Sequence, residues 1–152
     1  MKKIVLLAFL AFSLVGYTQQ SEEDQVKQTI ETFFEAFHKQ DTVALKTMAA
    51  DNIIMQSIGK NKEGAVKLNQ SDFAQFVKSI GSIPKDKTFE EKLFGFNIQV
   101  DGAMANAWTP YEFWFDGNFS HCGVNSFQLM KVKEDWKIIY LVDTRRREGC
   151  QD

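Results

Sequence analysis

The chain has 152 residues, with 18 basic and 20 acidic side chains and a net charge of −2. Its basic residues form no stripe interleaved with aromatic residues, which excludes the usual nucleic-acid-binding surface. Two cysteines and two histidines without zinc-type spacing predict neither a metal site nor another cofactor. The 14 Phe, 3 Trp and 3 Tyr indicate a wide core or a lined cavity.

Residues 1–19 have the pattern of a secretory signal peptide. Two lysines precede an apolar run over residues 4–15, and small residues follow it. As a helix that run would measure about 18 Å, which is short of a bilayer core. We therefore predict a signal peptide over 1–19, a single domain over 20–152, and a periplasmic or secreted protein that leaves the membrane after cleavage. An uncleaved anchor is the alternative.

Helical periodicity opens the predicted domain. Ser21 and the acidic residues after it begin a helix that carries an apolar stripe of Val26, Ile30, Phe33, Phe34 and Phe37. Asp41 is expected to cap a second helix over 42–50, and Ser71 or Asp72 to start a third that ends near Gly81. Between these helices we expect a short β-rich run, a turn and a second short run (52–58, 59–64 and 65–69).

From Thr88 onward the apolar period changes to two, which predicts strands. The four candidates are 88–100, 103–116, 119–133 and 136–145. The turns between them are Asp101-Gly102, Gly117-Asn118 and Glu134-Asp135. Helices followed by an antiparallel meander favour an α+β fold rather than a wound parallel sheet.

Two-residue turns fix which side chains share a face of this sheet. One face is predicted to carry Trp108, Glu112, Trp114, His121, Asn125, Phe127, Leu129, Ile138, Tyr140 and Val142. The other is predicted to carry Phe94, Phe96, Ile98, Ala105, Ala107, Tyr111, Phe113, Cys122, Val124, Met130, Ile139 and Leu141. Because both faces are apolar, something must cover each of them. The helices can cover one, and a second copy of the chain, in a homodimer through the sheet, can cover the other.

The local sequence resembles the nuclear transport factor 2-like superfamily. The segment "FFEAFHKQDTVALKTMAADNIIM" is similar to its opening helices, and "AWTPYEFWFDGNFSHCGVNSFQLMKVKEDWKII" to the C-terminal half of its bacterial SnoaL-like members. The resemblance implies a cone-shaped, cystatin-like fold, with helices packed on a strongly curved antiparallel sheet around a mostly apolar cavity. It also implies that the steroid isomerases' oxyanion Tyr falls at Phe33 and their carboxylate base near Ser57. Those replacements exclude steroid-type isomerisation.

Neighbouring residues on a strand point to opposite faces, so His121 and Cys122 cannot form one metal site or thiol dyad. In an exported protein Cys122 has a better use, which is a disulfide with Cys150. The predicted register places Cys122 opposite Arg147, and Gly149 lets the tail bend back. The alternative is one buried thiol and one tail cysteine without a partner.

His121 shares its predicted face with Glu112, near the large rings of Trp108 and Trp114. The pair could act as a general acid or base, orient a ligand's polar group, or stabilise the rim of the cone. On this reading the ligand-binding residues are Trp108, Glu112, Trp114, His121, Asn125 and Tyr140. His121 and Glu112 are also the candidate catalytic residues. By contrast, Asp143 falls on the other face and is interpreted as structural.

The sequence thus favours an exported domain that binds a small, largely apolar or aromatic ligand without catalysis. Two alternatives stay open. One is a SnoaL-like cyclase, isomerase or dehydratase that uses the His121–Glu112 pair. The other is a structural or partner-binding domain whose own rings fill its cavity.

Overall fold

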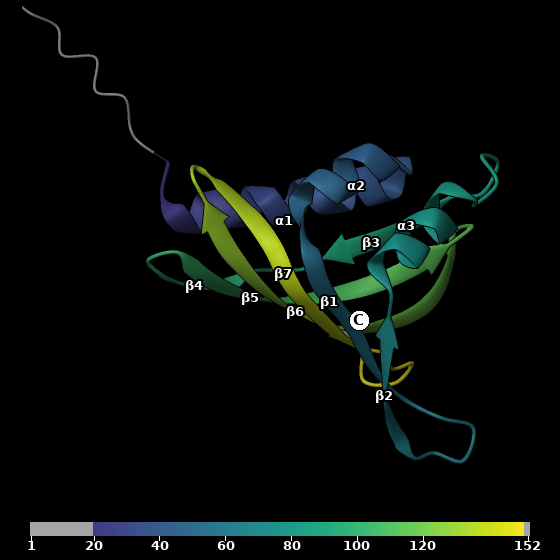
Figure 1. Ribbon diagram of the computed structural model, residues 1–152. Coiled ribbons are helices and arrows are strands. Elements are labelled where there is room, and N and C mark those ends of the chain that lie inside the picture. The colour runs from purple at the N-terminus through teal and green to yellow at the C-terminus, as the bar shows by residue number, and fades with distance from the viewer. Residues whose placement is uncertain (1–19, 151–152) are drawn as a thin grey trace, which may run out of the picture.

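The computed structural model describes residues 20–150, in which three helices lie on one side of a seven-stranded sheet (Figure 1). They are α1 (Glu22–Lys39), α2 (Thr42–Met48) and α3 (Phe73–Gly81). The predicted caps are confirmed, because the side chains of Ser21, Asp41 and Asp72 each accept a backbone N–H in the first turn. None of the helices within residues 20–150 is long and apolar enough to cross a membrane. The predicted signal peptide lies outside the described residues.

The α+β prediction is confirmed, but the sheet is mixed rather than antiparallel throughout. Its strands are β1 (Ala49–Lys60), β2 (Val66–Ser71), β3 (Phe89–Leu93), β4 (Asn97–Asp101), β5 (Met104–Phe115), β6 (Asn118–Val132) and β7 (Asp135–Thr144). They follow the order β2-β1-β7-β6-β5-β3, and β4 also pairs with β5. Strand β1 runs parallel to β7 because the chain passes through α3 and the whole meander before it returns beside β1.

The predicted strand over 88–100 is two strands, β3 and β4, which both pair with β5. The break faces Pro110, which has no N–H to donate to a ladder. The N–H of Phe94 donates to the Pro110 carbonyl at 3.0 Å, but Pro110 can return no bond. The ladder therefore stops at Leu93 and resumes at Asn97.

The core lies between α1 and the face of the sheet that the helices cover, which we call the inner face. The α1 stripe predicted from the sequence is buried there. It packs with inner-face side chains that include Phe127, Leu129 and Ile138, none of which has any solvent exposure. A fully buried side chain of this kind contributes about 1.5–3 kcal/mol.

Two one-residue bulges decide which side chains reach the inner face. Ser120 is the extra residue in β6, so that Phe113 rather than Glu112 pairs with His121. Ile139 is the extra residue in β7, and the shift it causes pairs Asn125 with Asp143. Because side chains alternate with a period of two, each bulge reverses the predicted faces beyond it. The inner face consequently mixes members of both predicted lists.

The predicted disulfide between Cys122 and Cys150 is confirmed, with a Cα–Cα distance of 5.8 Å. Cys122 is bridged to Arg146 rather than to the predicted Arg147. The turn before β7 lies at 133–134, one residue earlier than predicted, which moves the partner back by two residues, and the bulge in β7 moves it forward by one. The bond closes a sequence separation of 28 residues. On the chain-entropy model this closure stabilises the fold by about 3.5 kcal/mol. It also ties the end of the chain to the sheet.

Candidate functional site

A pocket of about 570 Å³ opens between the inner face, α1 and α3. Its apolar lining, which we call the apolar wall, includes Phe33, Phe34, Phe37, Phe76, Phe113 and Leu141. The rings of Phe37 and Phe76 stack at 6.0 Å, which joins α1 to α3 across the wall. The volume falls within the roughly 300–1,000 Å³ typical of small-molecule sites. The pocket can therefore accept a ring-sized ligand.

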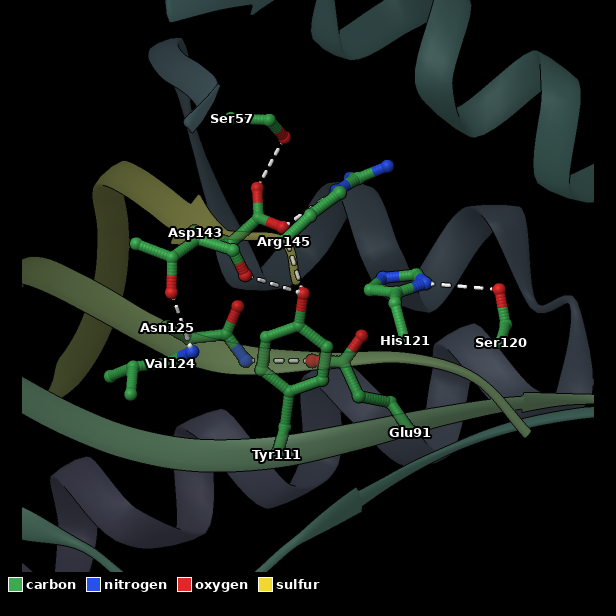
Figure 2. A network of polar contacts seen from close by, with 10 residues as sticks. Ser57, Glu91, Tyr111, Ser120, His121, Val124, Asn125, Asp143 and Arg145 are labelled. Carbon is green, nitrogen blue, oxygen red and sulfur yellow. Dashed lines mark hydrogen bonds and ion pairs between the residues drawn. The ribbon is translucent and has the colours of Figure 1, made fainter. Parts of the chain in front are cut away.

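The polar lining of the pocket, which we call the polar wall, takes one residue from each of five strands, namely Ser57, Glu91, Tyr111, Asn125 and Asp143 (Figure 2). The register brings these residues together, because both Ser57 on β1 and Asn125 on β6 pair with Asp143 on β7. Paired residues on neighbouring strands point to the same side of a sheet. Ser57, Asp143 and Asn125 thus form one row across the inner face, and Tyr111 and Glu91 lie on the same face in neighbouring rows.

Asp143 is the centre of the hydrogen-bond network in the polar wall. One carboxylate oxygen accepts a hydrogen bond from Ser57. The other accepts from the Tyr111 hydroxyl at 2.9 Å and from the Arg145 Nε at 2.7 Å. Because Asp143 is only 8% exposed, an unpaired charge there would be costly. These three donors together offset the loss of water.

Gly123 makes the close packing of this site possible. A Cβ at this position would lie 1.7 Å from the Thr144 carbonyl oxygen and 3.0 Å from the Tyr111 ring. That carbonyl oxygen lies 3.0 Å from the Tyr111 hydroxyl, which shares its proton between Thr144 and Asp143. Any larger residue at Gly123 would push the end of β7 away from the polar wall.

Glu91 is held in the pocket from two sides. Its carboxyl oxygen accepts from the Asn125 amide at 2.6 Å, and its backbone N–H donates to His38 Nε2 at 2.9 Å. Burial raises the pKa of Glu91 to about 8, and the nearby charge of Asp143 adds to that rise. The carboxyl is therefore mostly protonated at neutral pH. His38, which we expected to be an ordinary helix-end residue, instead connects α1 to β3.

His121 lines the pocket beside two rings. Its imidazole lies 5.2 Å from the Phe113 ring and 5.7 Å from the Tyr111 ring, between centroids. Its Nδ1 is 3.1 Å from the Ser120 hydroxyl. Burial lowers the pKa of His121, and the charge of Arg145 lowers it further. The imidazole is therefore neutral at pH 7.

Of the six predicted ligand-binding residues, only His121 and Asn125 line the pocket. The other four lie on the opposite face of the sheet, the outer face: Trp108, Glu112, Trp114 and Tyr140. There, Glu112 accepts from the indole N–H of Trp114 at 3.0 Å, and the Tyr140 hydroxyl donates to Gln56 at 2.5 Å. The predicted His121–Glu112 pair is wrong, because the bulge at Ser120 places the two side chains on opposite faces.

Sequence reasoning missed four residues of the site: Glu91, Tyr111, Asp143 and Arg145. One signal was available, since Asp143 and Arg145 alternate at the end of a strand and must share a face. The assembled groups are a protonated carboxyl, a neutral imidazole and a guanidinium paired with a carboxylate. Such groups can orient a ligand or exchange a proton with it. Within residues 20–150, no three His, Cys, Asp or Glu side chains gather as a metal site would require.

Solved structures of several bacterial proteins share this fold. A nuclear transport factor 2-like protein from Cytophaga hutchinsonii matches with a TM-score of 0.66 and 11% identity, over 84% of this chain and 100% of its own. One of unknown function from Shewanella baltica matches with a TM-score of 0.59 and 13% identity, over 82% and 94%. A protein from Streptomyces avermitilis, named as a candidate dehydratase of the same family, matches with a TM-score of 0.61 and 14% identity, over 82% and 95%. No protein-family model and no curated protein sequence matches the chain.

The chain has the nuclear transport factor 2-like, or cystatin-like, fold. This confirms the fold implied by the sequence resemblance, whereas the narrower SnoaL-like assignment stays a prediction. At these identities the likeness carries the fold alone, and function has to be argued from the pocket.

The raised pKa of Glu91 predicts that Glu91→Gln becomes more stable relative to the wild type as pH increases. The folded wild-type protein holds a proton on Glu91 up to about pH 8, whereas a glutamate in the unfolded chain releases it near its ordinary pKa of 4.5. Wild-type stability therefore falls between those two pH values, by up to a few kcal/mol from this group. The amide of the variant is always neutral and is free of that loss.

Urea unfolding of both proteins at pH 5, 7 and 9 measures the effect. The free-energy difference between variant and wild type should shift in favour of the variant across the series. A difference that stays constant with pH would mean that Glu91 is ionised in the folded protein.

Proposed function

We propose that this chain is an exported binding protein which holds a small, largely apolar molecule in the pocket of its nuclear transport factor 2-like fold. The observation that carries the proposal is that the pocket is lined by a group of aromatic and aliphatic side chains, the apolar wall, together with the hydrogen-bonded groups of the polar wall. Such a lining suits a ligand with an apolar body and one polar group, because each end then finds matching surroundings. Export is supported by the signal-like residues 1–19 and by the disulfide, a bond that persists in oxidising compartments.

Binding in this pocket predicts that a bulky side chain at its mouth blocks the ligand. Ser79 lines the pocket from the exposed side of α3, so Ser79→Trp should weaken binding by at least about 10-fold without unfolding the protein. The neighbouring Lys78 is also exposed but does not line the pocket, and Lys78→Trp is the matched control. A thermal-shift screen of small ring-containing compounds finds ligands, and calorimetry on the hits compares the two variants.

Equal affinities in the Ser79→Trp and Lys78→Trp variants would place the ligand outside the pocket. A screen without any saturable shift would leave the pocket without a binding role.

Proton-transfer catalysis is a second candidate function, and Glu91 is the observation that favours it. A carboxyl with a pKa of about 8 in a pocket can both donate and accept a proton near neutral pH. The Tyr111 hydroxyl and the His121 imidazole line the same pocket. An isomerase or dehydratase needs such groups, and the Streptomyces avermitilis protein named as a candidate dehydratase has this fold. Glu91 would take the acid-base role that the sequence analysis assigned to Glu112.

If Glu91 transfers protons, the protein should speed the exchange of the protons next to the carbonyl of a bound ketone. Proton NMR in D2O with 1-tetralone follows this exchange, and Glu91→Gln should slow it by about 10²- to 10⁴-fold while binding persists. Lys78→Trp serves as a folded control. Exchange at the buffer rate in the presence of ketone-saturated wild-type protein would leave binding as the only function.

A homodimer through the outer face is the second part of the proposal. All three helices pack on the inner face, and the outer face carries exposed apolar side chains that include Ile54, Met104 and Trp108. Trp108 is 53% exposed in the single chain. Apolar surface of this kind on a soluble protein commonly marks an interface. A second copy would cover it, as we expected from the sequence.

Trp108→Glu should therefore convert a dimer to a monomer at micromolar concentration, because a charge at the centre of an apolar interface loses its water. Light scattering measures the mass of each species. Val43→Glu introduces the same charge at an exposed apolar residue of α2, on the helix side of the sheet, and should leave the dimer intact. A monomeric wild-type protein would contradict this proposal and leave the pocket proposal unaffected.

A further inference from the structure

We infer that the molecule bound in this pocket is an organic anion, with a carboxylate that contacts the guanidinium of Arg145 and an apolar body that lies on the apolar wall. The inference rests on the proposed binding function and adds the chemical class of the ligand. It is carried by the geometry and surroundings of Arg145 at the end of β7.

Arg145 presents half of its guanidinium to the pocket. Its Nε donates to Asp143 at 2.7 Å, and its two terminal nitrogens make no hydrogen bond or ion pair within residues 20–150. The side chain lines the pocket and is 57% exposed, and Figure 2 shows its tip directed over His121. Two parallel N–H groups on one edge of a guanidinium match the two oxygens of a carboxylate.

The Asp143 contact also holds this guanidinium in place before any ligand arrives. A free arginine side chain loses rotamer freedom when it binds, which costs about 0.5–1.5 kcal/mol. Here one edge is already fixed by a buried carboxylate, which Tyr111 and Ser57 hold in turn. The open edge is thus preorganised for an anion.

The charges of the residues around Arg145 are compatible with one bound anion. Asp143 is already bonded to three donors, and Glu91 is mostly protonated at neutral pH. Asp72 also lines the pocket, but its carboxylate caps α3 by accepting the N–H of Gln75. The positive charges of Arg145 and Arg147 both lower the pKa of His121, so both act within the pocket. An anion beside Arg145 therefore meets positive charge.

The position of Arg145 determines how the ligand lies. The guanidinium is partly exposed, so a carboxylate bound to it keeps some of its water and avoids most of the desolvation cost. The rings of Phe37, Phe76 and Phe113 supply the apolar surface for the body of the molecule. A ligand of this kind binds with its acid group toward solvent and its apolar body in the pocket.

Paired probes of one shape test the charge. Fluorescence titration of the wild-type protein with 2-naphthoate and 2-naphthamide compares an anion with its neutral equivalent, and the carboxylate should bind about 10-fold more tightly. In Arg145→Gln the affinity for the carboxylate should fall about 10-fold, while the affinity for the amide should change by less than about 2-fold. Arg146→Gln is the matched control, because Arg146 is exposed, donates to Gly149 and does not line the pocket.

The outcomes separate the two proposals. Equal affinity of the two probes for the wild-type protein, or a carboxylate preference that survives in Arg145→Gln, overturns the anion inference and leaves a neutral-ligand pocket. If neither probe saturates at millimolar concentration, the binding function and the anion inference both fail. The wild-type comparison needs no variant, so it decides the charge question even if Arg145→Gln unfolds.

Discussion

The buried carboxylate of Asp143 is the constraint on which the arrangement of this site depends. A charge with 8% exposure must be matched by donors, and its donors come from β1, β5 and the residue after β7. These contacts fix how the parallel strand β1 meets β7, where the Tyr111 ring lies, and which edge of Arg145 stays open. The polar wall is therefore a cooperative network, in which the loss of one donor leaves a costly charge for the others.

The two neighbouring carboxyl groups of this network have different surroundings. Asp143 receives hydrogen bonds from three side chains, one of them charged, whereas Glu91 receives one from a neutral amide. Burial raises the pKa of Glu91, and the nearby charge of Asp143 adds to that rise. Two acidic residues in one pocket thus supply a fixed charge and a neutral acid. That combination is compatible with ligand orientation as well as with proton transfer.

Much of the fold was predictable from the sequence, because caps, apolar periods and turn residues are local signals. Ser21, Asp41 and Asp72 begin their helices as predicted, and the disulfide follows from two cysteines in a chain that is predicted to be exported. The site was less predictable. Nothing local marks the bulge residues Ser120 and Ile139, yet each reverses the side-chain alternation that follows it. The parallel pairing of β1 with β7 is likewise a long-range property.

The bulge at Ser120 also affects how residues should be equated among proteins of this fold. A relative that kept the residue at position 120 but paired it regularly with its counterpart of Phe113 would present its counterpart of Glu112 beside the histidine, even if every amino acid were identical. Alignment columns in this hairpin then join side chains from opposite faces. Homologous positions would have to be assigned by counting ladder partners outward from the turn. A role transferred by sequence position alone would be given to a side chain on the opposite face of the sheet.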